Sequence, residues 1–347
     1  MVVNHEKLKV VLFEIAKNAG ANDYEAEILA DSIVDAELRG MSSHGLVRYP
    51  SYMNRIKQGM YATNVEPVVE KDEGAVVLLD AQNGLGAPMA MKAMETAMER
   101  AAKYGISLVG MNHANHFGCG SYYTQYAAAK GMITFIIANA NAWVAPYGGA
   151  KKKLGTNPLG FAIPNGDKPP FVVDMATSEA AQGKVVVASK KGISVPPTWG
   201  VDSQGNPCTD PHAILNGGAL MPFGGPKGYG ISLGIELLCS ALAGGCRSTE
   251  MGSMFDTEKL VGTGFLICAI DVSKMVDPTV FAGRVQQIFD DMKDASTEER
   301  EVLIPGEIEE RKTAAAKANG IEVADAVYED LKKLAEEYGV SVGDVAM

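Results

Sequence analysis

The sequence predicts an α/β protein in which the two ends of the chain form a separate helical lobe. Apolar residues recur at helical spacing through the first sixty residues, and the chain after residue 277 is again helical and charged. Between these parts, short apolar runs typical of buried strands alternate with helical segments, which is the pattern of an α/β domain. A chain of 347 residues is long enough for two domains. We therefore predict a lobe of residues 1–72 with 301–347 and an α/β core of residues 73–300.

Three helices are expected in the N-terminal part. Residues 6–19 carry apolar side chains at helical spacing. Asn22 caps a second helix, because Glu25 follows three residues later in a capping-box arrangement. The third helix begins after Gly45 and holds Pro50 near its first turn, where proline is tolerated.

In the middle of the chain, strand-like and helical segments alternate. Buried strands are expected where short apolar runs occur, at residues 75–79, 106–111, 133–137, 160–163, 171–174 and 264–270. Helices are expected around them, at residues 90–104, 120–130 and 228–242. The charged C-terminal part predicts a helix that begins at Pro305 and stops at Gly320, and a last helix over residues 324–338.

The composition argues against several classes of function. A net charge of -11 argues against nucleic acid as a partner, because binding a phosphate backbone requires a basic surface. The five cysteines form no CxxC pair and no HExxH motif occurs, so a metal site is not expected. The N-terminus does not read as a signal peptide, and the most apolar run, residues 133–145, is too short to span a bilayer. We therefore expect a cytoplasmic protein without a membrane partner.

The segment at residues 39–50 contains the most informative pair of residues. His44 follows Ser43 and precedes a glycine, and Arg48 comes one helical turn later. Histidine gives and takes protons near neutral pH, and a guanidinium binds a carboxylate through two hydrogen bonds. Tyr52 lies one further turn along the same helix face. A proton-transfer residue beside a carboxylate-binding residue predicts an enzyme that acts on a hydroxy or keto acid.

A second histidine cluster lies between a predicted strand and a predicted helix, where α/β folds place functional side chains. His113 and His116 are three residues apart, but no Asp or Glu lies nearby in the sequence to complete a metal site. His116 is a candidate general acid or base, and Asn112 and Asn115 are available to orient rings or substrate. For His113, a hydrogen-bonded structural histidine is the alternative.

Two glycine-rich loops are candidates for binding phosphate. The loop at residues 83–88 lacks the third glycine and the downstream acidic residue of a dinucleotide-binding fingerprint, so we reject it. The loop at residues 223–230 offers backbone N–H groups, Lys227 and the start of a long helix, which are the components of an anion site. Asp174 ends an apolar strand, where a carboxylate can accept hydrogen bonds from ribose hydroxyls, orient a histidine or cap the next helix.

Six segments of the chain, at these spacings and in this order, carry a resemblance to a known family. They are RGMSSHGLVRYPSYMNRI, NHFG, PYGGAKKKLGTNPLGFAIP, VVDMATS, GPKGYG and LIPGE. With them the chain resembles the malate/L-lactate dehydrogenase type 2 family, which includes ureidoglycolate, sulfolactate and diketogulonate dehydrogenases and a cyclic-imine reductase. The resemblance implies a nicotinamide-dependent oxidoreductase with a non-Rossmann, mixed-sheet fold like that of L-sulfolactate dehydrogenase. It also implies a homodimer whose active sites lie near the subunit interface.

The resemblance further implies roles for residues at matching positions. His116 matches the acid/base of ureidoglycolate-type members, and His44 matches that of diketogulonate-type members. Arg48 and Tyr52 match substrate-contacting positions, and Ser43 is included with them as a substrate-binding candidate. Cofactor contacts are implied for residues from four segments, namely Ala140, Asp174 with Met175 and Ala176, Lys227 with Gly228, and Pro305 with Gly306.

We predict reversible hydride transfer between C4 of the nicotinamide and C2 of a small 2-hydroxy/2-oxo acid of the malate, lactate, ureidoglycolate or sulfolactate type. Arg48 would bind the carboxylate, and one histidine would take the hydroxyl proton while the other polarises the oxygen, with His116 favoured as the base. NAD is the expected cofactor and NADP the alternative. The alternative functions are reduction of a cyclic imino acid or a diketo sugar acid, a ureidoglycolate lyase, and a non-catalytic binder of anionic metabolites.

Overall fold

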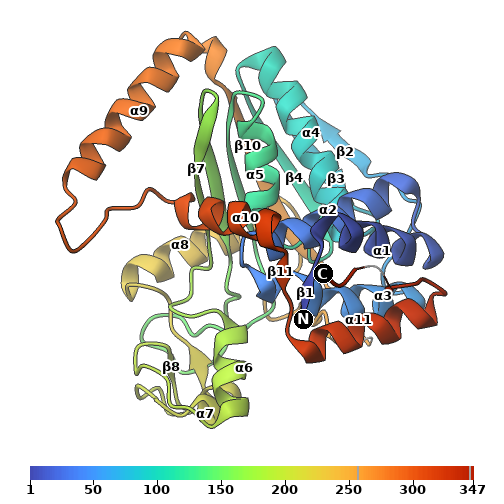
Figure 1. Ribbon diagram of the computed structural model, residues 1–347. Coiled ribbons are helices and arrows are strands. Elements are labelled where there is room, and N and C mark those ends of the chain that lie inside the picture. Colours follow the sequence, from blue (N-terminus) through green and yellow to red (C-terminus); the bar gives the residue numbers. More distant parts are fainter. Residues whose placement is uncertain (256–257, 344) are drawn as a thin grey trace.

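A seven-stranded sheet forms the centre of the computed structural model, which describes residues 1–255, 258–343 and 345–347 (Figure 1). Among these residues the strands follow one another across the sheet in the order β2-β3-β4-β10-β5-β6-β7. Their bounds are β2 Val68–Asp72, β3 Val76–Asp80, β4 Ile106–Ala114, β5 Met132–Ala138, β6 Leu159–Asn165, β7 Lys168–Met175 and β10 Thr263–Asp271.

The described sheet is mixed, because β3 and β4 pair in parallel whereas the other neighbouring strands pair antiparallel. β10 comes from the C-terminal third of the chain and lies between β4 and β5. A doubly wound dinucleotide-binding fold has a mostly parallel sheet instead. The prediction of a non-Rossmann α/β fold with a mixed sheet is therefore confirmed.

Two neighbouring helices, α4 (Gly86–Tyr104) and α5 (Gly120–Ala128), pack against the sheet (Figure 1). α4 contacts β4 and β10, and α5 contacts β5, β6 and β7. The inner face of α4 consists of small buried side chains at helical spacing, which are Ala90, Ala93, Ala97 and Ala101. α4 starts earlier than the sequence predicts, at Gly86 rather than residue 90.

The two ends of the chain pack together, and their labels lie side by side in Figure 1. β1 (Val2–Val3) pairs antiparallel with β11 (Ile321–Glu322). One hydrophobic cluster joins side chains from both ends of the chain. Its helices are α1 (His5–Asn18), α2 (Asp23–Leu38), α3 (Tyr49–Lys57) and α11 (Asp325–Glu337), and α10 (Glu307–Asn319) packs on α2. The exact limits of the helical lobe, residues 1–72 with 301–347, stay a prediction.

The local signals for the N-terminal helices are confirmed. The side chain of Asn22 accepts the N–H of Glu25 at 2.9 Å, and the carboxylate of Glu25 accepts the N–H of Asn22 at 3.0 Å, which completes the capping box. Pro50 lies in the first turn of α3. This helix starts later than the sequence indicates, because two short 3-10 turns, Ser42–His44 and Leu46–Arg48, precede it.

The chain between β7 and β10 contains elements that the sequence does not predict. They are α6 (Gln182–Lys191), α7 (Pro211–Leu215), β8 (Gly200–Val201) and β9 (Ala219–Leu220). Side chains of this part form small hydrophobic clusters of their own, separate from the main core. The edge strand β2 is fully exposed and charged, so it lacks the apolar pattern that marks the buried strands.

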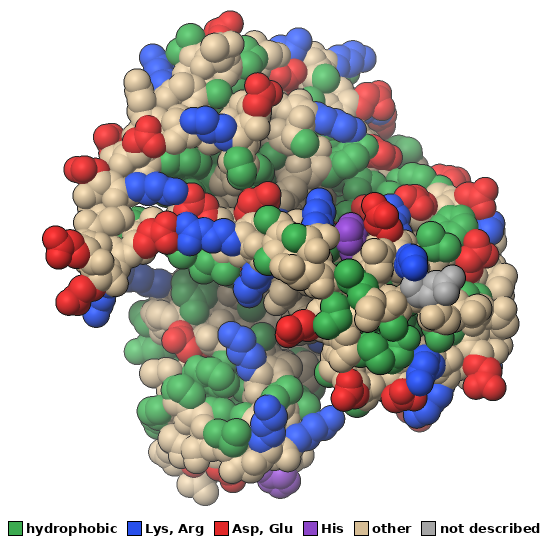
Figure 2. Space-filling model, in the orientation of Figure 1, with side chains coloured by type: hydrophobic (Ala, Val, Ile, Leu, Met, Phe, Trp, Pro, Cys, Tyr) green, Lys and Arg blue, Asp and Glu red, His purple; other side chains and the backbone are tan. Residues whose placement is uncertain are grey.

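The predicted long apolar helix is present as α8 (Pro226–Glu236), and a π-helical segment at Leu237–Leu242 continues it. α9 (Pro278–Asp294) projects from the body of the molecule (Figure 1). Figure 2, drawn in the orientation of Figure 1, shows acidic and basic side chains interspersed over this face of the molecule. Within the described ranges, no helix combines the length and the apolar character that crossing a bilayer requires.

Candidate active site

A cavity of about 460 Å³ is lined by segments from several parts of the chain. Its walls include the loop before α3, the β4–α5 connection, the ends of β5 and β7 and the start of α6. Eight of the predicted site residues line it together, which are Ser43, His44, Arg48, His116, Ala140, Asp174, Met175 and Ala176. Groups that are remote in the sequence therefore meet around one space.

The two candidate proton-transfer residues lie next to each other at the wall of this cavity. The ring centroids of His44 and His116 are 5.7 Å apart, and the rings are stacked with an angle of 18° between their planes. His116 lies just after β4, on the connection to α5. Gly86 permits this placement, because a Cβ there would lie 2.1 Å from the carbonyl oxygen of His116. A glycine of the rejected phosphate loop thus has a packing role.

Tyr52 holds the ring of His116 in place. Its hydroxyl lies 2.6 Å from Nδ1 of His116, and the backbone N–H of Gly118 lies 3.3 Å from the same nitrogen. Burial raises the pKa of Tyr52, so the side chain stays a protonated phenol. A histidine whose Nδ1 is engaged in this way presents Nε2 to a ligand. Tyr52 itself is outside the lining of the cavity among the described residues.

Both imidazoles are neutral at neutral pH. Burial lowers the pKa of His44 to about 4, and the guanidinium of Arg48 adds to this effect. Burial also holds the pKa of His116 well below its usual value, with smaller contributions from His44 and Arg48. A neutral imidazole has a lone pair that can accept a proton, which is the state a general base requires.

Arg48 reaches the cavity from the same loop as His44. Its Nε–H donates to the carbonyl oxygen of Ser43 at 2.7 Å, and one Nη lies 3.6 Å from Sδ of Met254. The guanidinium also lies 5.1 Å from the ring centroid of Phe255. Burial lowers the pKa of Arg48, but a guanidinium remains charged in a protein. Its further N–H groups are suited to an anionic ligand in the cavity.

Another part of the cavity has groups suited to a nucleotide cofactor. Asp174 lies at the end of β7, and its Oδ2 accepts the backbone N–H of Ser121 at 2.8 Å in the first turn of α5. Burial raises the pKa of Asp174. Gly118 and Gly183 line the same cavity, and a Cβ at either position would meet nothing within 4 Å. A carboxylate beside space that glycines leave open fits a ribose and its neighbouring groups.

Four predicted cofactor residues are outside the lining of this cavity among the described residues, which are Lys227, Gly228, Pro305 and Gly306. Lys227 is exposed in the first turn of α8. Gly228 is packed so closely that a Cβ would lie 2.0 Å from the carbonyl oxygen of Phe223. The carbonyl oxygen of Pro305 accepts the N–H of Val172 at 3.1 Å, so this turn lies against β7.

The structure adds cavity residues that the sequence did not single out, among them Cys119, Trp143, Lys184, Met254 and Phe255. Lys184 follows a glycine at the start of α6, which is the same kind of signal that pointed to Lys227. The others have no neighbouring motif that could have revealed them. His113 lies elsewhere, with its exposed ring 3.1 Å from a carboxylate oxygen of Asp80.

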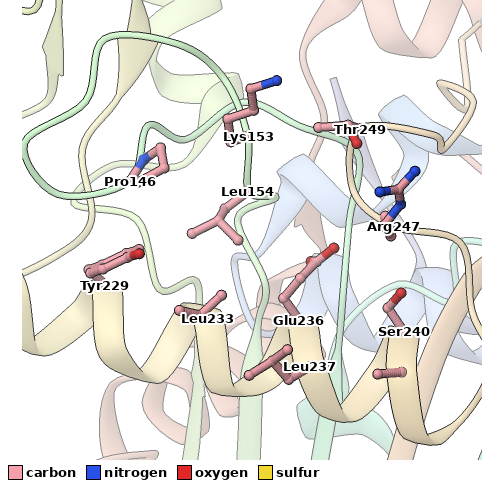
Figure 3. A pocket seen from close by; sticks show the side chains of 11 residues that line it. Pro146, Lys153, Leu154, Tyr229, Leu233, Glu236, Leu237, Ser240, Arg247 and Thr249 are labelled. Carbon is pink, nitrogen blue, oxygen red and sulfur yellow. The ribbon is translucent and has the colours of Figure 1, made fainter.

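A second cavity, of about 340 Å³, lies between α8 and the loop at residues 146–154 (Figure 3). Leu154 and Leu233 line it from its two sides, and Tyr229 and Leu237 extend the apolar wall. None of the predicted site residues is among its described lining residues. The described residues also contain no group of three or more His, Cys, Asp or Glu side chains placed to hold a metal ion.

Comparison with known proteins shows a likeness over the full chain. The family model for malate/L-lactate dehydrogenase matches residues 3–332. The chain is 37% identical over 345 residues to L-sulfolactate dehydrogenase from Methanocaldococcus jannaschii, with 99% of each protein covered. The solved structure of sulfolactate dehydrogenase from Methanocaldococcus jannaschii superposes with a TM-score of 0.93, again over 99% of both chains.

Two further relatives carry the name of their cofactor. Ureidoglycolate dehydrogenase (NAD(+)) from Escherichia coli O157:H7 is 33% identical over 336 residues, with 95% of each protein covered. The (2R)-3-sulfolactate dehydrogenase (NADP(+)) from Chromohalobacter salexigens is 32% identical over 319 residues, which cover 91% of this chain and 92% of the relative. The family match and these relatives together show that the chain belongs to the malate/L-lactate dehydrogenase family.

Proposed function

We propose that the chain is a nicotinamide-dependent dehydrogenase that transfers a hydride reversibly between NAD(P) and C2 of a small 2-hydroxy/2-oxo acid. The observation that carries this proposal is the meeting of His44, His116 and Arg48 at one cavity. Two neutral imidazoles and a guanidinium are the groups required to move a hydroxyl proton and to bind a carboxylate. Membership of the malate/L-lactate dehydrogenase family and the dehydrogenase relatives support the same reaction.

The loop before α3 would hold the substrate. Arg48 binds the substrate carboxylate through its Nη groups, because its Nε is already engaged by the Ser43 carbonyl. The Ser43 hydroxyl lies 2.9 Å from Nδ1 of His44, so it helps to orient that ring beside the substrate. The C2 oxygen of the bound acid then lies near the two stacked imidazoles.

His116 would move the proton. During oxidation the neutral ring, in the tautomer whose Nδ1–H donates to the Tyr52 oxygen, accepts the hydroxyl proton at Nε2, and during reduction the protonated ring returns that proton to the oxygen. The hydroxyl of Tyr52 stays bonded to Nδ1 and orients the ring, so this geometry supports an orienting role in place of the direct substrate contact expected from the sequence. His44, whose ring stacks on that of His116, polarises the C2 oxygen.

The cavity wall around Asp174, Met175, Ala176 and Ala140 would hold the cofactor. The Asp174 carboxylate can accept hydrogen bonds from ribose hydroxyls, and the open glycine-lined space beside it leaves room for them. The backbone N–H of Ala140 donates to the side chain of Asn157 at 3.1 Å, which fixes this part of the wall. When bound, nicotinamide supplies or accepts the hydride at C4. NAD is the preferred cofactor, and NADP is the alternative.

The direct test follows nicotinamide absorbance while the purified protein is given 2-oxo acids with NADH or NADPH. The panel includes pyruvate, oxaloacetate, a 3-sulfonated 2-oxo acid and a cyclic imino acid. Oxidation of the cofactor by at least one 2-oxo acid is expected. Turnover of the imine alone would replace the proposed substrate class, and failure of every substrate with both cofactors would overturn the proposal.

The pH dependence of oxidation follows from the low pKa values of the histidines. A general base must be neutral, and burial lowers the pKa of His44 to about 4 and holds the pKa of His116 well below its usual value. We therefore expect kcat/KM for oxidation of the hydroxy acid to hold as the pH falls through about 6.5, the usual pKa of histidine, and to decline only at a lower pH. A pH profile measured over this range checks the expectation, and an acid limb near 6.5 would contradict it.

We also propose that the protein is a homodimer and that it is cytoplasmic. The resemblance implies a homodimer with active sites near the interface, and the sequence favours a cytoplasmic location. A single chain supplies the four cavity residues of this proposal, which are His44, His116, Arg48 and Asp174.

A further inference from the structure

Glu37 is a buried carboxylate that the proposed chemistry does not use. It lies near the end of α2, is 7% exposed and is outside the described lining of the cavity. One carboxylate oxygen accepts the backbone N–H of Leu46 at 2.7 Å, and the other accepts the hydroxyl of Ser42 at 2.8 Å. These two partners lie on either side of His44 in the sequence.

Gly45 leaves the space that the carboxylate occupies. A Cβ at this position would lie 2.1 Å from Oε1 of Glu37 and 2.6 Å from its Cδ. The φ angle of Gly45 is −92°, so the close approach of the carboxylate, and not a left-handed backbone, excludes a side chain here. The glycine that follows His44 is therefore explained by Glu37.

The loop around His44 needs such an anchor, because its regular structure is short. It consists of the 3-10 turns Ser42–His44 and Leu46–Arg48, and neither turn has a side-chain cap. Glu37 bonds to the first residue of each turn, and Arg48 closes the loop on itself through the carbonyl of Ser43. One carboxylate thus ties both turns to α2 and, through them, the side chains of His44 and Arg48.

We propose that Glu37 is a positioning residue, which sets the separation of His44 and Arg48 by bonding to both turns of their loop. The inference rests on the proposed function, in which His44 polarises the substrate oxygen and Arg48 binds the carboxylate. A carboxylate that fixes both turns keeps the imidazole of His44 and the guanidinium of Arg48 at the separation that one bound substrate requires. Small displacements of catalytic groups reduce rates strongly, so loss of the anchor is costly even though Glu37 does not contact the substrate.

The test compares Glu37→Ala with Glu37→Gln. Alanine removes both hydrogen bonds, so kcat/KM for the 2-oxo acid is expected to fall about tenfold, with a lower kcat and a higher KM. Glutamine is expected to restore most of the activity. Its carbonyl oxygen can accept from Leu46 and its amide can donate to the Ser42 hydroxyl, which both donates and accepts. Gly45→Ala is expected to behave like Glu37→Ala, because its Cβ displaces the carboxylate.

Three measurements separate positioning from a general loss of structure. The Kd for the nicotinamide cofactor and the melting temperature of Glu37→Ala are expected to stay close to those of Glu27→Ala, a matched change of an exposed carboxylate on the same helix. Hydrogen exchange of the Leu46 amide is expected to speed up in Glu37→Ala but not in Glu27→Ala. Hydrogen exchange does not depend on turnover, so it reports on the anchor even if the wild type reduces no 2-oxo acid. Such a lack of activity would contradict the proposed function and not the positioning role of Glu37.

The proposal is overturned by any of three outcomes. Activity of Glu37→Ala within about twofold of the wild type would show that the anchor is not needed. Equal losses in Glu37→Ala and Glu37→Gln would assign the effect to the charge rather than to the two hydrogen bonds. Unchanged exchange of the Leu46 amide would show that the loop holds its position without Glu37.

Discussion

His116→Ala is expected to lower kcat by about 10²–10⁴-fold, which is the usual contribution of a general acid or base. The imidazole of His116 stacks on His44, is hydrogen-bonded at Nδ1 to the Tyr52 hydroxyl and borders the cavity, which leaves Nε2 for the substrate. Alanine removes the proton acceptor but keeps the backbone that packs against Gly86. Steady-state kinetics in both directions, with the cofactor Kd measured separately, provide the readout.

His113→Ala is the matched control, because His113 belongs to the same segment but is exposed and pairs with Asp80 away from the cavity. Its activity is expected to stay within about twofold of the wild type. Near-normal turnover of His116→Ala would remove His116 from the proton-transfer role. If His44→Ala then showed the larger loss of kcat, the roles of the two histidines would be reversed.

Arg48→Ala is expected to lower kcat/KM for the 2-oxo acid by about 10²-fold or more, mostly through KM. A hydrogen bond to a charged group contributes about 1.5–3 kcal/mol, and the substrate carboxylate would lose at least one such bond in a partly buried place. Because lysine cannot reproduce the two-point geometry of a guanidinium, Arg48→Lys is expected to recover only part of the loss. Initial rates over a range of substrate concentrations separate KM from kcat.

Two controls accompany the Arg48 variants. The Kd for the cofactor is expected to be unchanged, because the residues that we propose for cofactor binding are Asp174 and its neighbours. Arg284→Ala removes an exposed arginine of α9 and is expected to leave the kinetics as they are. A KM in Arg48→Ala equal to that of the wild type would show that the carboxylate binds elsewhere.

The sequence predicts features that depend on local patterns. The capping box of Asn22 and Glu25, the proline at the start of α3 and the apolar runs of the buried strands each reflect interactions within a few residues, so they can be read directly. His44 and His116 could be selected as candidate proton-transfer residues, because the neighbouring residues in the sequence narrow the roles that each histidine can have. The absence of a dinucleotide fingerprint also fits the mixed sheet, since a dinucleotide-binding fold has a mostly parallel sheet, whereas β3 and β4 are the only parallel neighbours among the described strands of this sheet.

Features that depend on contacts between distant segments could not be predicted in this way. The bond between Tyr52 and His116 joins residues 64 positions apart. Helical spacing could place Tyr52 only on the same face as Arg48, and the family resemblance implied a substrate contact for it. The residues around Glu37 in the sequence show only an ordinary helical pattern. The close approach of Gly45 to its carboxylate in the structure points to the positioning role that we propose. Lys227 has the sequence neighbours of an anion-binding residue, but α8 carries it to an exposed position outside the main cavity.

The joining of the chain ends has a consequence for synthesis on the ribosome. Leu46, the first residue of the turn that carries Arg48, belongs to the same hydrophobic cluster as Tyr328 and Leu331 of α11. The nascent chain therefore exposes part of this apolar surface until α11 has emerged, because the partner residues do not yet exist. The turn that carries Arg48 is translated early, but it is fully packed only once α11 has been made.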